Sequence, residues 1–347
     1  MKKLRIGYFP LSKDLTHPGD RRRLVYWAQT RGHELVMNPD QNIDFIVASE
    51  TTDLYQLPRS HKGIPIVYDL IDAYLTPDSQ LRNYGRGFAK FINRSVTGRP
   101  KRYTETVQDY CEIASATVCS SQEQSASIKR YSKNVHIILD SHDEFPLSSY
   151  KGQNHSSSKN IVWEGMPYTL PGLFEIRGPL NSLAKEFKVN LDIVTDLNFK
   201  KYLGRYVSQS TEDKIRSVYS DSPFTVNLIP WEINALVSKT RNSHLGIIPV
   251  KDNAFHWLKP ENRLLIMWRL GIPCITSATP SFSRVSEATG SDIVCSSKTE
   301  WVLKISRVLE DPLYAEHNVV LGQKYLRENH SKEILLSKWD NVVKSVI

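Results

Sequence analysis

Short apolar runs alternate with amphipathic stretches over the first 140 residues of the chain. The amphipathic stretches predict helices that begin near Arg21 and that cover 122–131. The apolar runs have the length of strands, and they lie at 4–9, 34–37, 44–48, 64–69, 116–119 and 135–139. Short apolar strands separated by helices are typical of a parallel, doubly wound sheet. The pattern therefore predicts a Rossmann-like α/β domain at 1–150.

A polar, serine-rich stretch at 143–160 interrupts this alternation and predicts a linker. The alternation then restarts, with a helix at 261–270 and strands at 160–163, 190–194, 224–228, 244–249 and 273–276. We expect a second Rossmann-like domain at 159–330, facing the first across a cleft in which ligands bind. A helix at 331–347 carries apolar residues at helical spacing, so it should pack back on the N-terminal domain.

Composition narrows the class of protein. A chain of 347 residues with 40% apolar and 24% charged residues suits two globular domains. Four scattered cysteines and ten histidines show no metal-ligand spacing, and no Asp-x-Asp motif occurs, so we expect no metal. No apolar run reaches the length of a membrane span and no signal-peptide core follows the first residues, which predicts a cytoplasmic protein. The net charge of +8 favours an anionic partner, which includes nucleotides, phosphorylated lipids, membrane surfaces and nucleic acids.

A candidate phosphate site lies where the strand at 246–250 leads through a loop into the helix at 261–270. Glu261 in the first turn suits the positive end of the helix dipole. Free backbone amides, the Asn262 side chain and the Arg263 guanidinium can together hold a diphosphate. The alternative is an ordinary helix–strand unit in which Arg263 is a solvated surface charge.

Pro-x-Asn-Arg at 260–263, followed by Gly-Ile-Pro-Cys-Ile-Thr-Ser at 271–277, resembles the donor-binding signature of GT-B glycosyltransferases, especially family 4. Weaker similarities to the same family follow in the correct order, and they lie at 66–72, 113–121, 135–140 and 161–165. The resemblance implies a hexosyltransferase that uses a nucleotide-diphosphate sugar, such as a UDP- or GDP-sugar, as co-substrate. It also implies retention of configuration, independence of metal and no further cofactor.

The resemblance assigns most donor contacts to the second domain. Trp231 occupies the place of the residue that contacts the base, and Arg263 that of a diphosphate ligand. The other expected donor-binding residues are Glu164, Gly165, Asn227, Lys251, Lys259, Glu261 and Asn262. One departure matters: the position of the second carboxylate of the family's Glu-x7-Glu holds Ile266 here, and Lys259 stands next to that of the first. The usual carboxylate contacts to the donor sugar and ribose are therefore in doubt.

Acceptor-side candidates lie in the N-terminal half. His17, Gly19 and Arg21 follow the first strand, where Gly19 would allow close backbone approach and the arginines at 21–23 would meet an anionic acceptor. A solvated arginine patch is the alternative. Asp69 and Asp72 end the fourth strand, and either can bind an acceptor hydroxyl; we expect Asp72 to act with Arg263 in catalysis. Capping of the next helix is the competing role for both aspartates.

The segment 81–103 contains seven basic residues and no acidic residue. Arg82, Arg86, Lys90 and Arg94 form one helical stripe opposite the apolar Phe88 and its neighbours. Such a helix suits an anionic membrane surface or a lipid-linked acceptor, and it equally suits a domain helix with its apolar side in the core.

These features together predict a glycosyltransferase in the assembly of a surface polysaccharide or glycolipid, located in the cytoplasm and peripherally on the inner face of the membrane. Its partners would be a nucleotide sugar and a glycan or lipid-linked acceptor. One alternative keeps the fold and makes hydroxylated bases of DNA the acceptor, with the basic patches following the phosphates. A second alternative is a GT-B-like binding protein without catalysis, which the missing carboxylates suggest.

Overall fold

The computed structural model describes residues 2–37, 39–76, 85, 87–88, 90–92, 96–97, 100–152, 157–201 and 207–347. The chain divides into two compact units. The first unit comprises Met1–Ser141, Asn253–Pro260 and His330–Ile347, and the second comprises His142–Asp252 and Glu261–Asn329. The first unit thus ends before residue 150 and includes a short segment, 253–260, that the sequence places in the second domain. That segment joins the first unit because its side chains pack there, as with the Phe255 and Tyr74 rings, whose centroids lie 6.0 Å apart.

The first unit is built on a six-stranded sheet with the order β2-β1-β3-β4-β5-β6, in which all neighbours are parallel. Its strands are β1 Arg5–Phe9, β2 Glu34–Met37, β3 Phe45–Ser49, β4 Ile66–Leu70, β5 Ala116–Cys119 and β6 Val135–Ile137. Its helices are α1 Pro18–Arg21, α2 Leu24–Arg31, α3 Leu57–Ser60, α5 Tyr103–Ile113, α6 Gln122–Ile128, α11 Ala254–Trp257 and α16 Lys332–Val346.

Side chains from both faces of this sheet are buried. Along β3, Phe45 and Val47 belong to one apolar cluster, whereas Ile46 and Ala48 belong to another. Successive side chains of a strand point to opposite faces, so a strand covered on both faces must be apolar throughout. This explains why the strand appears in the sequence as an uninterrupted apolar run.

The C-terminal helix α16 packs on the first unit, as predicted. Its Trp339 is fully buried and stacks on Trp27 of α2, with ring centroids 6.0 Å apart. The indole N–H of Trp27 also donates to Asp340 at 2.8 Å. The helix therefore completes one of the two apolar clusters of the N-terminal sheet.

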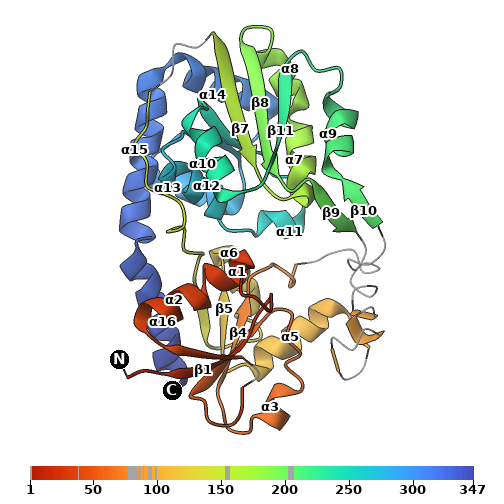
Figure 1. The fold of residues 1–347 in the computed structure, drawn as a ribbon, viewed down its shortest axis with the longest axis vertical. Coiled ribbons are helices and arrows are strands. Elements are labelled where there is room, and N and C mark those ends of the chain that lie inside the picture. The colour runs from red at the N-terminus through yellow and green to blue at the C-terminus, as the bar shows by residue number, and fades with distance from the viewer. Residues whose placement is uncertain are drawn as a thin grey trace. The chain divides into compact units, whose positions relative to one another are not determined.

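The second unit contains another parallel six-stranded sheet, of order β11-β8-β7-β12-β13-β14, and a separate antiparallel hairpin of β9 and β10 (Figure 1). Its strands are β7 Ser158–Glu164, β8 Lys188–Thr195, β9 Asn198–Lys201, β10 Val207–Ser210, β11 Thr225–Pro230, β12 Leu245–Ile248, β13 Cys274–Ser277 and β14 Val294–Cys295. Its helices are η1 Pro167–Thr169, α7 Leu170–Glu175, α8 Arg177–Leu183, α9 Thr211–Tyr219, α10 Ile233–Arg241, α12 Asn262–Arg269, α13 Pro280–Thr289, α14 Lys298–Glu310 and α15 Pro312–Asn329.

Local signals explain several helix ends in this unit. Thr279 begins α13 by accepting a hydrogen bond from the Phe282 amide, and Ser297 begins α14 in the same way. Gly290 ends α13 in the left-handed conformation, with φ of 67°. The helix α12 buries Trp268, whose indole N–H donates to Asn318 of α15 at 3.0 Å. The position of α12, which begins with Asn262 and Arg263, is thus fixed by packing of Trp268 in the core of the second unit.

Both sheets change winding direction beside their first strand. In the first unit β1 lies between β2 and β3, and in the second unit β7 lies between β8 and β12. Ligands of doubly wound sheets bind outside the carboxyl ends of the strands at such a switch point. We therefore expect ligand contacts in the loops after β1 and β3 in the first unit, and in the loops after β7 and β12 in the second.

The basic segment 81–103 is described only in part. Arg82, Arg86 and Arg94 lie outside the described residues, as does most of the predicted stripe. Phe88 and Ile92, which belong to its apolar side, are 55% and 61% exposed, so these two side chains are not in the core.

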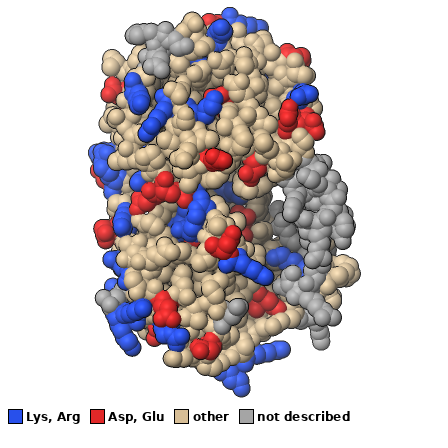
Figure 2. Space-filling view, viewed as in Figure 1, with Lys and Arg blue, Asp and Glu red and all other residues tan. Residues whose placement is uncertain are grey.

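No helix in the described part of the chain is long and apolar enough to cross a membrane. On the face shown in Figure 2, the Lys and Arg side chains are interspersed with Asp and Glu. The coloured residues of that face therefore do not form a single basic track.

Candidate functional site

Three of the predicted donor-binding residues meet at the switch point of the second unit. Glu164 is the last residue of β7, Trp231 follows the end of β11, and Arg263 lies in the first turn of α12. The Arg263 guanidinium donates from Nη1 to the Glu164 carbonyl at 3.1 Å. The Trp231 indole N–H donates to Oε1 of the Glu164 carboxylate at 2.9 Å. Three elements far apart in the sequence thus converge on one residue at the carboxyl edge of the sheet.

Arg263 carries a charge that no carboxylate neutralises directly. Burial lowers the pKa of its guanidinium, and the charge of nearby Glu164 opposes this effect. Within the described residues Arg263 forms no ion pair, and its hydrogen bond to the Glu164 carbonyl is to a neutral group. A partly buried cation is costly unless it is paired, and a bound anion would supply the missing partner.

Two glycines allow the backbone to approach closely at this edge. A side chain at Gly165 would place its Cβ 2.7 Å from the Thr169 hydroxyl and 3.0 Å from Nη1 of Arg263. A side chain at Gly172 of α7 would lie 2.6 Å from the Pro249 carbonyl oxygen, in the loop after β12. The two loops of the switch point are therefore held tightly against their neighbours, and Gly165 fits its predicted position in the turn.

Several polar atoms of residues at the ends of β7 and β8 and the start of α12 are buried without a hydrogen-bond partner in the described structure. They are Oε2 of Glu164, Oδ1 of Asn262 and Oγ1 of Thr195, the last of these at the end of β8. Buried acceptors are normally satisfied, because an unsatisfied one costs about 1–3 kcal/mol. The Glu164 and Asn262 side chains are neighbours of Arg263, so this edge of the sheet holds polar atoms that a ligand can satisfy.

The other predicted donor residues of the second unit are differently placed. Asn227 lies within β11 rather than at its end, and its amide donates to Asp192 at 2.9 Å. Glu261 is buried and pairs with Arg284, with 3.3 Å between its Oε2 and the arginine Nη2. Lys251 is exposed in the loop after β12. Asn227 and Glu261 are therefore engaged with protein groups, while Lys251 is accessible.

Lys259 belongs to the first unit rather than to the neighbourhood of Arg263. Its Nζ lies 3.2 Å from Oδ1 of Asp72 and 4.9 Å from the centre of the Phe255 ring. The segment containing Lys259 is also bound by Ser121, whose hydroxyl donates to the Leu258 carbonyl at 2.7 Å. The structure thus places the lysine beside the aspartate that was expected to act in catalysis.

Glu50 is a candidate residue that sequence reasoning missed. It follows β3 directly, at the switch point of the first unit, and its Oε2 accepts the backbone N–H of Asp72 at 2.8 Å. The Tyr74 hydroxyl donates to Oε1 at 3.4 Å. Burial raises the pKa of Glu50 to about 7, and the negative charge of Asp72 contributes to this increase. The sequence feature that could have identified Glu50 is a carboxylate that directly follows an apolar strand.

The expectation that Asp69 binds an acceptor hydroxyl is wrong, because its carboxylate is engaged by another side chain. Arg23 donates to both of its oxygens, from Nη2 at 2.6 Å and from Nε at 3.0 Å, and both side chains are buried. Although burial alone would lower the pKa of Arg23, the charge of Asp69 raises it. Asp69 and Arg23 form a structural ion pair in the core. The arginine side chain therefore does not lie in a solvated patch.

The loop after β1 is organised by Asp20, which sequence reasoning did not select. Asp20 is buried and accepts hydrogen bonds from the Tyr8 hydroxyl at 2.6 Å and from the amides of Leu11 and Ser12. Its carboxylate therefore fixes the course of the loop that carries the predicted acceptor residues.

The predicted residues of this loop differ in accessibility. His17 is exposed, and its Nδ1 accepts the amide of Gly19 at 3.1 Å. Arg21 donates from Nη1 to the Thr16 carbonyl at 2.7 Å. A Cβ on Gly19 would lie 2.6 Å from side-chain carbons of Leu11 and Ile71. Gly19 therefore serves packing of the loop, whereas His17 lies at the surface.

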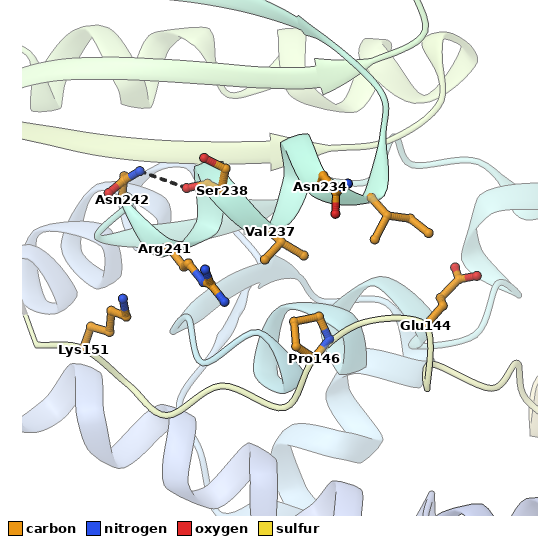
Figure 3. Close-up of a pocket in the computed structure, with 9 residues that line it drawn as sticks. Glu144, Pro146, Lys151, Asn234, Val237, Ser238, Arg241 and Asn242 are labelled. Atoms are coloured by element: carbon orange, nitrogen blue, oxygen red, sulfur yellow. Dashed lines mark hydrogen bonds between the residues drawn. The ribbon is translucent and has the colours of Figure 1, made fainter.

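A separate pocket of about 540 Å³ lies in the second unit beside α10 (Figure 3). Figure 3 shows Val237 and Arg241 extending from this helix toward the chain segment that contains Pro146. None of the predicted donor residues lines this pocket. The constellation around Glu164 is therefore distinct from the pocket.

Comparison with known proteins extends these observations. No family model matches the sequence, and no curated protein matches it. Among solved structures, HepE from Anabaena in complex with UDP and glucose superposes with a TM-score of 0.64 and 11% identity, over 99% of this chain and 100% of HepE. WaaG, a glycosyltransferase involved in lipopolysaccharide biosynthesis, superposes with a TM-score of 0.58 and 14% identity over 99% of both chains. The chain has the GT-B fold.

A third structure with the GT-B fold is more distant in size. TarM superposes with a TM-score of 0.61 and 12% identity, over 86% of this chain and 54% of TarM, so the chain spans about half the length of TarM. The predicted α/β architecture of two Rossmann-like units is therefore confirmed. At such low identity the likeness concerns the fold, and the activity has to be argued from the site.

Proposed function

We propose that the protein is a glycosyltransferase that transfers a sugar from a nucleotide-diphosphate donor to an acceptor hydroxyl. The observation that carries this proposal is the half-buried Arg263 at the switch point of the second unit, which has no ion-pair partner among the described residues. A diphosphate supplies the anion that such a guanidinium lacks, and it can accept several hydrogen bonds from it. HepE was solved in complex with UDP and glucose, and a TarM variant in complex with UDP, which supports this class of ligand.

In this proposal the diphosphate binds Arg263 and the amides of the first turn of α12, and the base lies near Trp231. As the bond to the sugar breaks, negative charge develops on the leaving diphosphate. Arg263 is already in place to stabilise that charge, and preorganised electrostatic stabilisation is usually the largest contribution to catalysis. Independence of metal and retention of configuration are further parts of the proposal, as the resemblance to family 4 implies.

We propose that the acceptor binds at the carboxyl edge of the first unit. Asp72 is partly exposed, with 30% of its side chain accessible, whereas Asp69 is engaged by Arg23. His17 is exposed in the loop after β1, at the same edge. Carboxylate and imidazole groups accept hydrogen bonds from sugar hydroxyls. A glycan or lipid-linked glycan is therefore the proposed acceptor class, and the involvement of WaaG in lipopolysaccharide biosynthesis supports it.

Calorimetric titration with UDP, GDP and ADP tests the donor site. At least one of them should bind saturably, and Arg263→Gln should weaken that binding by about 10-fold or more, because hydrogen bonds to charged groups contribute about 1.5–3 kcal/mol. Arg241→Gln is the matched control, since Arg241 is an exposed arginine beside the pocket of Figure 3. Failure of all three nucleotides to bind, or equal effects of the two substitutions, would contradict the proposal.

Turnover is tested separately from binding. Slow hydrolysis of the bound nucleotide sugar by the purified protein, abolished by Arg263→Gln, would exclude the non-catalytic alternative. Binding to duplex DNA with a steep dependence on salt would instead favour DNA as the acceptor. We expect hydrolysis of the donor and only weak, non-specific binding of DNA.

A further inference from the structure

The contacts at the switch point of the second unit have a linear order. Trp231 contacts the carboxylate of Glu164, and Arg263 contacts its carbonyl oxygen. Glu164 is therefore the middle member of the series Trp231, Glu164, Arg263. A nucleoside diphosphate has the covalent order base, ribose, diphosphate. If the base lies near Trp231 and the diphosphate near Arg263, the ribose must pass over Glu164.

We propose that Glu164 is the residue that binds the ribose hydroxyls of the donor and distinguishes ribonucleotides from deoxynucleotides. This inference rests on the proposed function and assigns a specific role to one residue of the same site. Its chemical basis is simple: a ribose 2′- or 3′-hydroxyl donates a hydrogen bond, and an ionised carboxylate accepts up to about four. The indole of Trp231 occupies one of these positions, on Oε1.

The second oxygen of Glu164 has capacity left for a ligand. Oε2 is buried and has no hydrogen-bond partner in the described structure, and the same holds for Oδ1 of neighbouring Asn262. An unsatisfied carboxylate oxygen is expensive in a partly buried site, and a ribose hydroxyl would satisfy it. Glu164 also lies at the end of β7, a central strand of the sheet, and the parallel ladder to β8 pairs it with Val194.

The nearby positions 259, 261 and 266 do not supply a carboxylate for the ribose. Position 266 holds a buried isoleucine, which contributes to the core. Lys259 pairs with Asp72 in the first unit. Glu261 is buried and engaged by Arg284. None of these three positions therefore offers an available carboxylate. In this proposal Glu164, at the end of β7, makes the hydrogen bond to the ribose.

A purely structural role is the competing explanation for Glu164, because its carboxylate satisfies the Trp231 indole. Glu164→Gln separates the two roles. The glutamine oxygen can still accept the indole N–H, whereas the charge and most of the remaining acceptor capacity are lost. A structural role predicts little change in ligand preference, and a ribose-binding role predicts a specific change.

The experiment measures binding of UDP, GDP and ADP and of their 2′,3′-dideoxy counterparts to the full chain by calorimetry. For the nucleotide that binds, the wild-type protein should prefer the ribose form by about 10-fold or more, as expected for hydrogen bonds to a charged group. Glu164→Gln should reduce this preference to about 2-fold or less. Arg263→Gln should weaken both forms by a similar factor and leave the preference unchanged.

The outcomes distinguish this inference from the proposed function. If a ribonucleotide binds and depends on Arg263, yet Glu164→Gln keeps the wild-type preference, the ribose assignment is wrong and the donor site stands. Equal binding of the ribose and dideoxy forms by the wild-type protein would also overturn the assignment, and this comparison needs no variant that might misfold. If none of the nucleotides binds, the proposed function fails and the assignment with it.

Discussion

Removal of the Asp69 carboxylate should destabilise the first unit strongly. The Arg23 guanidinium is completely buried, and Asp69 accepts two of its hydrogen bonds, at 2.6 and 3.0 Å. The guanidinium also contacts the Ile138 carbonyl and, at 3.5 Å, both the Ser120 hydroxyl and the Asp140 carboxylate. Asp69→Ala leaves most of a buried charge uncompensated, and breaking such a pair typically costs about 3–5 kcal/mol. For a domain of this size, that cost corresponds to a decrease in Tm of roughly 10 °C.

The matched control removes both charges together. Asp69→Leu combined with Arg23→Met should cost much less than Asp69→Ala, since replacing a buried ion pair by apolar side chains is often nearly neutral. Thermal unfolding followed by calorimetry, in the single and double variants, measures both effects. A decrease in Tm below about 2 °C for Asp69→Ala, accompanied by loss of transfer activity, would refute the structural interpretation and restore Asp69 as an acceptor ligand.

Three further predictions concern glycines and a buried acid. Gly165→Ala should weaken nucleotide binding by about 10-fold or more in calorimetric titration, because its methyl group would lie 2.7 Å from the Thr169 hydroxyl. Gly178→Ala is the control and should leave binding unchanged, because its Cβ would meet no neighbouring atom within 4 Å. Gly322→Ala, whose Cβ would lie 2.0 Å from the Trp268 ring, should cost about 1–3 kcal/mol or more, measured as a lower urea midpoint. The pKa of Glu50 is about 7 in the folded protein, against an ordinary value of 4.5. Between these two pH values the folded protein binds more protons than the unfolded chain. The free energy of unfolding should therefore fall by about 3 kcal/mol as the pH rises from 4.5 to above 7. Glu50→Gln should abolish that decrease, and an unchanged pH dependence in urea titrations would contradict the assignment.

The strands of both sheets were largely predictable from the sequence because both faces of each sheet are covered. β2 and β5 have the predicted bounds, α16 is one residue shorter at each end than the predicted 331–347, and most other strands begin or end within two residues of their predicted bounds. The hairpin of β9 and β10 was not predicted, and neither was the short strand β14. Two residues at a sheet edge, as in β14, carry no periodicity, so only the tertiary pairing with β13 defines that strand.

The candidate site was predictable where its residues lie at strand ends and helix starts. The helix start indicates Arg263, and the resemblance to family 4 indicates Glu164 and Trp231; the structure joins the three by hydrogen bonds. The errors concern pairing, which sequence position does not reveal. Asp69 meets Arg23, which precedes it by 46 residues. Lys259 belongs with the first unit although its neighbours in the chain belong to the second.

The carboxyl edges of the two sheets carry different polar groups. This difference supports the proposal that one unit binds the donor and the other the acceptor. Among the described residues, the second unit presents a guanidinium without an ion pair and, near it, buried oxygen atoms without hydrogen-bond partners. These groups suit a ligand that is anionic at one end and carries hydroxyls nearby. The first unit presents Asp72, which pairs with a lysine, above a buried carboxyl whose pKa of about 7 places its titration near neutral pH. Carboxyl groups of this kind can form hydrogen bonds with the hydroxyls of a neutral sugar. The distribution of polar groups therefore supports the proposal that the nucleotide binds to the second unit and the acceptor hydroxyl to the first.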